Sequence, residues 1–522
     1  MRSTFSGIEI SKRALFTQQA AINTTGHNIA NSNTEGYSRQ VVNMNAARPI
    51  EYPGLQKSTV PGQMGQGVEF NSVTRIRQQF LDDQFRNENK QLGSYTVQND
   101  TLDKLQSIMN EPSDSGIRTV LDNFWKSWTD LSKDPENVTG RKIVRENAVA
   151  LADAFNTISK QLNDLSNDLT SSIDTKATQV NSLSSSIASL NNEITRIEAL
   201  GDDANDLRDQ RDLLTDQLSK VVNIQVTNTP DGYNIDIGGT NLVTGKTSNA
   251  ITSVTLTGAY TSGYLNSGEV YGMIVSKDKY VADYKNQLDT LANSIATGNV
   301  QVTLPAGSVI PDGTVLNGIT YTGSVSARTL GSDLSVTVAG INGLHKLGYT
   351  FASPAKAGLD FFTSSSGAIT AGTFQLNQAI ADNPNLIATS MRTDDSTGTE
   401  QAVKGNNTLA NLISQLKESQ FTFNTTGTNG TVISSGKIDD YFGAIVGQLG
   451  VQAESLTRQV TNQKAIVEQI DSSRQSVSGV SLDEEMSNLI KFQHAYGAAS
   501  RFMTTIDQVL DKLINSTGVV GR

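Results

Sequence analysis

Three absences mark this amino-acid sequence: it has no cysteine, only three histidines and no long apolar run. Without thiols, disulfide bonds, cysteine nucleophiles and cysteine-based zinc or iron–sulfur sites are all excluded. No stretch approaches the roughly 18 consecutive apolar residues that a membrane-spanning helix needs. The N-terminal segment also lacks the apolar core of a cleaved secretory signal peptide. We therefore expect no membrane insertion, and either a cytosolic protein or one that is exported without cleavage.

Charge and motif content limit the function classes further. The 522 residues include 41 Lys and Arg against 52 Asp and Glu, so the formal net charge is −11. An acidic chain without a long basic run argues against nucleic acid as the main partner. His27, His345 and His494 are isolated, and neither a phosphate-binding loop nor a nucleophile-elbow motif is present. The sequence thus predicts no catalytic, cofactor or metal site, and no enzyme.

Proline placement separates helical stretches from a β-rich one. Residues 136–229 and 385–522 contain no proline, and their apolar residues recur at spacings of three and four. Over 151–197 this row predicts a long coiled-coil helix with one irregular step. A turn at Gly201 and a further apolar row that ends at Val221 complete an αα-hairpin.

Between these stretches the period changes from helical to alternating. Residues 222–237 alternate around a Thr-Pro-Asp-Gly turn and predict a β-hairpin. A helix near 278–297 and a small β insertion near 298–340 are expected to follow. The segment 420–436 predicts a polar loop or a short hairpin.

Three smaller features have structural interpretations. Trp125 and Trp128 are three residues apart on a predicted helix and are expected in the core. The run 206–212 alternates in charge and predicts a helix face with i,i+4 ion pairs. Glu485 lies in the first turn of the last predicted helix, where an acidic side chain suits the helix dipole.

Both chain ends carry apolar stripes with a seven-residue period. The stripes consist of Ile8, Leu15, Ile22 and Ile29 at the N-terminus, and of Leu482, Leu489, Phe492, Tyr496, Met503, Ile506, Leu510 and Leu513 near the C-terminus. A single stripe cannot bury itself, so we expect the two terminal helices to pair. Such a pair would still expose apolar surface, which marks a partner interface.

Together these patterns predict an α+β multidomain fold. Long α-helical, coiled-coil hairpin domains would be built from both chain ends, with an inserted β-rich outer domain. Three domains are expected: residues 1–35 with 477–522 as the paired terminal helices, 36–222 with 405–476 as a helical rod, and 223–404 as the β-rich outer domain.

One loop is more specific than any of these patterns. It follows the N-terminal helix, and its marked residues are Asn28, Ile29, Ala30, Asn31, Thr34, Gly36 and Tyr37. Asn and Thr side chains compete for backbone hydrogen bonds and glycine permits positive φ, so the chain is expected to stop the helix and turn here. The Ala-Asn-x-x-Thr-x-Gly-Tyr pattern resembles that of the bacterial flagellar rod, hook and junction axial proteins.

Within that group the chain is similar to the flagellar hook-associated protein 1 family. Four stretches carry this narrower resemblance: 36–40 with 67–70, the Asp-Gln-Arg-Asp helix at 207–214, a less regular region over 344–388, and 478–499. The resemblance covers almost the whole chain, with the β insertion near 298–340 as the main departure.

The resemblance implies a structural adaptor that assembles as a ring at the hook–filament junction and permits filament assembly. The partners it implies are the hook protein, the second hook-associated junction protein, further copies of the chain, and a cytosolic export chaperone that binds the C-terminal helix. It also implies an extracellular place in the flagellum, reached by type III export without a cleaved signal peptide.

Two alternatives stay open. A hook or distal-rod subunit of the same axial group would share the loop pattern, but the coiled-coil row at 151–197 favours the junction protein. A secreted adhesin or enzyme that uses the β domain would need a ligand pocket or metal constellation within 223–400.

Overall fold

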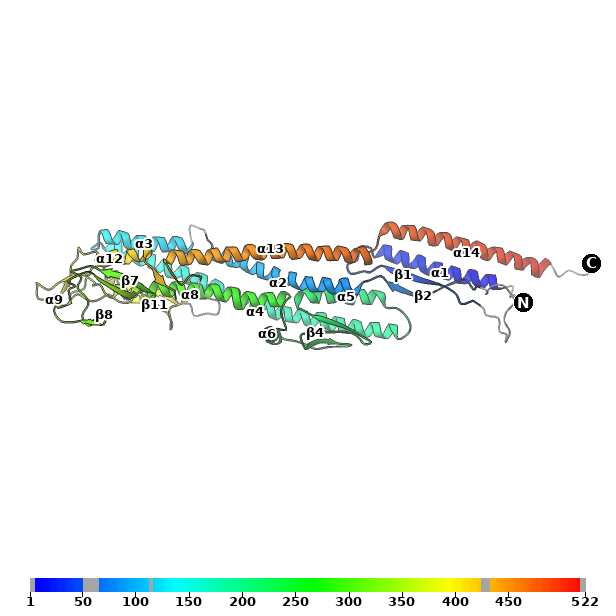
Figure 1. The fold of residues 1–522 in the computed structure, drawn as a ribbon, viewed down its shortest axis with the longest axis horizontal. Coiled ribbons are helices and arrows are strands. Elements are labelled where there is room, and N and C mark those ends of the chain that lie inside the picture. The colour runs from blue at the N-terminus through cyan, green and yellow to red at the C-terminus, as the bar shows by residue number, and fades with distance from the viewer. Residues whose placement is uncertain (1–4, 50–64, 112–115, 424–431, 517–522) are drawn as a thin grey trace, which may run out of the picture. The chain divides into compact units, whose positions relative to one another are not determined.

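The computed structural model describes residues 5–49, 65–111, 116–423 and 432–516. Its fold is α+β multidomain, as predicted, with long helices and several small antiparallel sheets (Figure 1). The chain divides into two compact units: unit 1 draws on 1–94, 174–271 and 461–522, and unit 2 on 95–173 and 272–460. The predicted division into three domains stays a prediction. No described helix combines the length and apolarity needed to cross a membrane.

Unit 1 contains both terminal helices. The elements that contribute residues to it are α1 (Ser6–Ala30), β1 (Gln40–Ala46), β2 (Val68–Arg75), α2 (Gln79–Met109), α4 (Val138–Glu198), α5 (Asn205–Val221), β3 (Gln225–Thr229), β4 (Gly232–Ile237), β5 (Thr240–Thr244), β6 (Thr247–Ser248), α6 (Ser253–Thr261), α7 (Glu269–Val275), α13 (Ile438–Ser478) and α14 (Leu482–Ser516). Helices α2, α4, α7 and α13 also contribute residues to unit 2.

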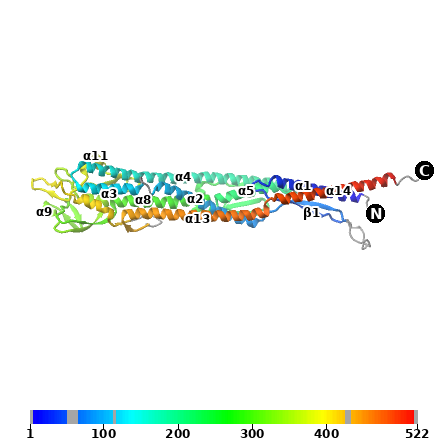
Figure 2. The same ribbon diagram turned by 90° about the horizontal axis from the view of Figure 1, so that it is seen from above.

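Helix α1 lies beside α14 in both views, and the antiparallel β1–β2 hairpin also packs against it (Figures 1 and 2). The fully buried residues of α1 are small or polar: Ser11, Thr17, Ala21, Thr25 and Asn28. Small side chains let the neighbouring backbones approach, and the Thr17 hydroxyl donates a hydrogen bond to the Val68 carbonyl at 3.4 Å. The sequence patterns did not indicate this pair of strands.

Helix α4 contains the predicted coiled-coil row but starts earlier, at Val138, and it buries Val144 and Ala148 as well. Lys176, the polar residue within the row, pairs with Glu269 at 2.6 Å. Near its end, the buried Asn191 donates to the carbonyls of Tyr233 and Gly245 and so holds the β3-β4-β5-β6 sheet against the helix. The predicted hairpin over 222–237 corresponds to β3 and β4.

Unit 2 combines helices with short strands. Besides its share of the helices named above, it contains α3 (Ile117–Lys133), a π-helical segment (Ser276–Val281), α8 (Ala282–Thr297), β7 (Asn299–Leu304), β8 (Thr314–Leu316), β9 (Ile319–Tyr321), α9 (Val325–Arg328), β10 (Leu334–Ala339), α10 (Gly340–His345), β11 (Phe362–Ser364), β12 (Phe374–Leu376), α11 (Gln378–Asp382), β13 (Thr393–Asp394), β14 (Gln401–Ala402), α12 (Thr408–Gln415), β15 (Phe421–Thr422) and β16 (Ser435–Gly436), with short 3-10 turns at Pro384–Leu386 and Leu416–Glu418.

The core of unit 2 is aromatic. Trp125 and Trp128 are buried, as predicted, and the ring of Trp128 lies 5.4 Å from that of Phe361. The β insertion supplies β7 and β10, which join β15 and β16 in one four-stranded sheet. The segment 420–436 thus forms a short hairpin at its two ends, while residues 424–431 lie outside the described part of the chain.

Candidate functional site

The loop that follows α1 is held from its first residue by a buried amide. The Asn28 side chain donates to the Gln40 carbonyl at 2.9 Å and accepts from the Gln40 amide at 3.0 Å, as a strand backbone would. Its oxygen also accepts from the Tyr37 hydroxyl at 2.8 Å. Burial, with the nearby carboxylates of Asp206 and Asp209, raises the pKa of Tyr37, so the phenol keeps the proton that it donates.

The turn itself explains the other motif residues. The Asn31 side chain accepts from the Thr34 hydroxyl at 3.2 Å, and the Thr34 carbonyl accepts from the Tyr37 amide at 3.2 Å. Gly36 has a φ of 79°, and a Cβ there would lie 3.0 Å from the side chain of Leu213. Only glycine combines this left-handed backbone with so close an approach to α5.

The next three residues each bind a different partner. The Ser38 amide donates to Asp209 of α5 at 2.8 Å, while the Gln40 side chain donates to Asp206 at 2.7 Å. The Arg39 side chain instead donates to Glu485 and Glu484 of α14, both at 2.7 Å. Successive side chains of an extended chain point to opposite sides, so this segment can bind α5 and α14 at once.

The helix-dipole interpretation of Glu485 was incomplete. Its side chain is buried, and besides pairing with Arg39 it accepts from the Asn28 side chain at 3.1 Å. The Glu485 carboxylate thus accepts hydrogen bonds from two residues of the N-terminal part of the chain, Asn28 and Arg39. The interruption of the apolar row therefore marks a specific contact between the two chain ends.

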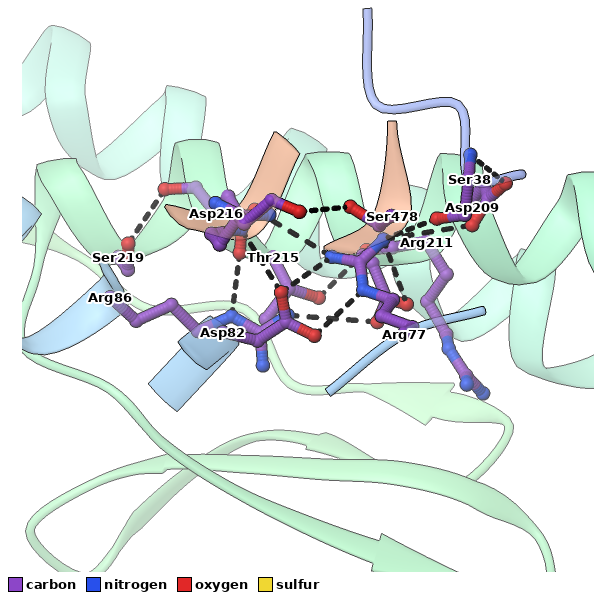
Figure 3. Close-up of polar contacts among 12 residues, drawn as sticks. Ser38, Arg77, Asp82, Arg86, Asp209, Arg211, Thr215, Asp216, Ser219 and Ser478 are labelled. Carbon is purple, nitrogen blue, oxygen red and sulfur yellow. Dashed lines mark hydrogen bonds and ion pairs between the residues drawn. The ribbon is translucent and has the colours of Figure 1, made fainter. Parts of the chain in front are cut away.

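An ionic network lies beside this segment, centred on α5 (Figure 3). Its arginines are Arg75, Arg77, Arg86 and Arg474, and its aspartates are Asp82, Asp209, Asp212 and Asp216. The charged run of α5 was expected to form i,i+4 pairs within the helix, and this expectation was wrong. Because α5 buries this face, its aspartates pair with arginines from other segments instead.

The network shifts the pKa values of two of its carboxylates in opposite directions. Burial alone would raise the pKa of Asp212, but Arg77, Arg75 and Arg86 outweigh it and lower that pKa to about 2. Burial dominates at Asp209 and raises its pKa, although Arg75 and the Ser38 amide oppose the shift. Removing one charge would therefore leave its buried partners short of a counter-charge.

The predicted apolar stripes are partly covered where α1 meets α14. Ile8, Leu15, Ile22 and Ile29 are half-buried, as are Leu489, Phe492, Met503 and Ile506, and Leu510 is buried. Gly7 permits the contact, since a Cβ there would lie 3.0 Å from Ile506. Three predicted stripe residues of α14, Leu482, Tyr496 and Leu513, are exposed instead. Other large apolar side chains on or next to the two helices are exposed as well: Phe5, Phe16, Met486, Ile490, Phe502, Val509 and Ile514.

The three histidines have separate surroundings. His27 lies 3.3 Å from Asp206 and packs edge-on against Tyr37, whereas His494 is exposed on α14. His345 is buried in unit 2, where its ring nitrogens contact the Leu359 carbonyl and the Ala388 amide. Within the described residues, no group of three His, Asp or Glu side chains could hold a metal ion.

Comparison with known proteins gives a consistent set of similarities. Residues 102–302 match the flagellar hook-associated protein FlgK helical domain. Residues 8–37 match the flagella basal body rod protein family, and residues 471–516 match the flagellar basal body rod FlgEFG protein C-terminal family. The last two matches cover the motif helix and α14.

Full-length relatives are similar as well. Flagellar hook-associated protein 1 of Bacillus subtilis is 34% identical over 544 residues and covers 100% of both chains. The protein of the same name from Escherichia coli is 26% identical over 95% of this chain and 97% of its own. The solved flagellar hook junction protein FlgK from Burkholderia pseudomallei, at 17% identity and a TM-score of 0.51, shares the fold over 76% of this chain and 100% of its own.

Proposed function

Because this chain belongs to the flagellar hook-associated protein 1 family, we propose that it is an adaptor that assembles as a ring at the hook–filament junction. Membership makes it a structural protein of the bacterial flagellum. The finer role is that it binds the distal hook, receives the second hook-associated junction protein, and so permits filament assembly. This role needs geometry and subunit affinity, and no covalent chemistry.

The observation that carries the proposal is the exposed apolar surface of the paired terminal helices. Met486, Ile490 and Val509 of α14 are about half exposed, and Phe16 of α1 and the preceding Phe5 are exposed further. Apolar faces of this kind on two neighbouring helices mark an interaction surface. We infer that neighbouring copies cover them in the ring, with the predicted stripe residues at or beside the contacts.

The motif loop would support that surface. Asn28, Gly36 and Tyr37 hold the loop against α5 and α1, and Arg39 reaches the first turn of α14. In this proposal the axial motif does not contact other subunits itself. It holds the two chain ends in the arrangement that other subunits recognise.

Two further parts of the proposal concern the chain before assembly. An exposed apolar helix such as α14 associates wrongly if nothing covers it, so a cytosolic export chaperone is expected to bind it until export. Export itself is expected to proceed through the flagellar type III route without cleavage of a signal peptide. The absence of cysteine suits this route, because no thiols can cross-link the chain in transit.

Deleting the gene in its own bacterium tests the junction role. The expected cells carry hooks without filaments and release filament subunits into the medium, and a plasmid copy of the gene restores filaments. Cells without hooks would overturn the junction role and support a hook or distal-rod subunit. Cells with normal filaments would overturn both.

A further inference from the structure

Arg39 spans the break between the two C-terminal helices. Helix α13 ends at Ser478 and α14 begins at Leu482. The Arg39 amide donates to the Ser478 carbonyl at 2.8 Å, and its guanidinium donates to Glu484 and Glu485. One residue from the N-terminal part of the chain thus binds the last residue of α13 and the first turn of α14.

The backbone between α13 and α14 does not by itself fix how the two helices are oriented. The Gly479 amide closes α13 by donating to the Gln475 carbonyl at 2.8 Å, and a Cβ on Gly479 would lie 2.4 Å from that oxygen. Ser481 opens α14, where its carbonyl accepts from the Glu485 amide at 3.0 Å. Between these two residues the helical hydrogen-bond ladder is interrupted, so the backbone alone does not fix the angle at which α14 leaves.

Arg39 is itself firmly held. Its carbonyl accepts from the Ile76 amide at 2.8 Å, and its neighbours Ser38 and Gln40 are bound to Asp209 and Asn28. Arg39 is therefore anchored on the motif segment and α5, outside the two helices that it binds.

We infer that Arg39 is a positioning residue that fixes the direction of α14 relative to the end of α13. A guanidinium presents several N–H donors in a rigid plane, so it can bind both carboxylates at once, which a lysine ammonium does with less directional control. Glu485 is the buried partner and Glu484 the exposed one. Arg39 thereby presents the exposed apolar face of α14 in one orientation.

This inference rests on the proposed function for its biological purpose, because ring assembly would require a defined orientation of α14. The contacts of Arg39, however, lie within a single chain. The inference can therefore fail while the junction role stands, and the junction role can fail while the inference stands. The two outcomes are separable because the test below needs no assembly.

The chain has no cysteine, so a pair of introduced cysteines can carry spin labels without background. Lys464 on α13 and Lys491 on α14 are exposed and lie on either side of the break. Lys464→Cys with Lys491→Cys, labelled with nitroxides, reports the distance between the two helices by double electron–electron resonance. We expect one narrow distance distribution in the parent monomer.

Arg39→Ala is expected to broaden this distribution while circular dichroism still shows the parent helix content. Arg39→Lys should broaden it less, and Glu485→Gln should broaden it because the amide keeps a hydrogen-bond acceptor for Asn28 but loses the charge that pairs with Arg39. The matched control is Arg13→Ala, which removes an arginine whose contacts to Glu9 and Glu69 are longer, at 3.5 and 3.9 Å. The control should keep the narrow distribution.

A narrow distribution in folded Arg39→Ala, equal to that of the parent, would overturn the inference. If Arg39→Ala loses its helix content, Arg39→Lys and Glu485→Gln decide the question at full helix content. Spin-label distance distributions that match the parent in both Arg39→Lys and Glu485→Gln would also overturn the inference. An Arg39→Ala, Glu485→Gln double variant that is broader than either single variant would show that the two residues act separately, which also contradicts the inference.

Discussion

The two units are stabilised by different interactions in their interiors. Unit 2 buries a cluster of aromatic rings, in which Phe362 stacks on Phe374 at 4.3 Å and packs edge-on against Phe361 at 4.9 Å. The interior of unit 1 around α5 contains paired arginines and aspartates instead. The stability that comes from buried apolar side chains depends on the area that they remove from water, not on charge. In a buried ion pair, loss of one partner leaves the other charge buried and unpaired, which is strongly destabilising.

The two units also differ in how many large apolar side chains they expose. Most of the large apolar side chains that stay exposed belong to unit 1, above all to α1 and α14. Unit 2 also exposes some apolar side chains, such as Val315 and Val451, but among the described residues it has no pair of neighbouring helices that expose as many as α1 and α14 do. In the proposed function, assembly covers the exposed apolar side chains of the terminal helices of unit 1.

The largest expected effect comes from truncating the aromatic core. Trp128→Ala should destabilise unit 2 by about 3–5 kcal/mol, because it removes a fully buried ring and leaves a cavity. Both tryptophans of the chain lie in unit 2, so the fluorescence of the remaining Trp125 reports its unfolding in urea. Phe80→Ala, at an exposed ring of unit 1, is the control and should leave the transition in place. An unchanged midpoint for Trp128→Ala would contradict the aromatic-core account.

A smaller effect is expected from removing one charge of the ionic network. Asp212→Asn keeps the side-chain shape but leaves Arg75, Arg77 and Arg86 short of a counter-charge, and should cost roughly 3 kcal/mol in unit 1. Circular dichroism should show an earlier helix transition while tryptophan fluorescence keeps the parent midpoint. Asp231→Asn, which removes an exposed carboxylate from a 3.6 Å pair with Lys246, should change neither. A fluorescence midpoint that moves together with the helix transition would break the distinction between the units.

The smallest effect is a difference in acid sensitivity. Burial lowers the pKa of His345 to about 4, so the folded state holds the ring neutral while the unfolded chain protonates near pH 6.5. The stability that comes from this neutral ring is complete above pH 6.5 and falls as the pH drops toward 4, by about 2 kcal/mol at pH 5. Asp212, with a lowered pKa of about 2, contributes stability that is complete above about pH 4 and is lost below it.

Fluorescence-monitored urea unfolding at pH 7 and pH 5 measures the His345 contribution. Half-buried carboxyl groups of unit 2, among them Asp289, have pKa values that desolvation raises, so their titration offsets part of the change in stability with pH. The contribution of His345 is therefore the difference between the parent and His345→Gln at the two pH values. Equal pH dependence in both chains would contradict the assignment.

Sequence patterns predicted the features that depend on residue spacing within a single segment. The heptad row over 151–197 was visible because its apolar residues recur at helical spacing and most of them are buried, and Trp125 with Trp128 was correctly placed in the core. The motif at 28–37 indicated the flagellar axial proteins, and four longer stretches indicated the hook-associated protein 1 family, which the full-length relatives confirm. These features depend on spacing within one segment, which a sequence displays directly.

The missed features depend on pairs that are distant in sequence. Arg75 and Asp209 meet across more than a hundred residues, and no local rule connects them. The β1–β2 hairpin was missed because the buried face of α1 that receives it is made of small and polar residues rather than an apolar stripe. At Glu485, the helix dipole already offered a sufficient local reason, so nothing indicated the contact with Arg39.

The central claim is that the exposed face of α14 serves assembly and not the fold of the monomer. The most direct measurement combines Met486→Ser, Ile490→Ser and Val509→Ser in the chromosomal gene and counts filaments per cell by electron microscopy. Substitutions at exposed sites away from specific contacts usually change stability by less than about 0.5 kcal/mol each, so the purified variant should keep a urea midpoint close to that of the parent.

The matched control replaces three exposed apolar residues elsewhere, Leu200→Ser, Val254→Ser and Val315→Ser, and should leave filaments in place. Cells with the α14 variant are expected to export the chain and build hooks, but to carry no filaments. Cells with the α14 variant that assemble filaments and swim as the parent does would contradict it.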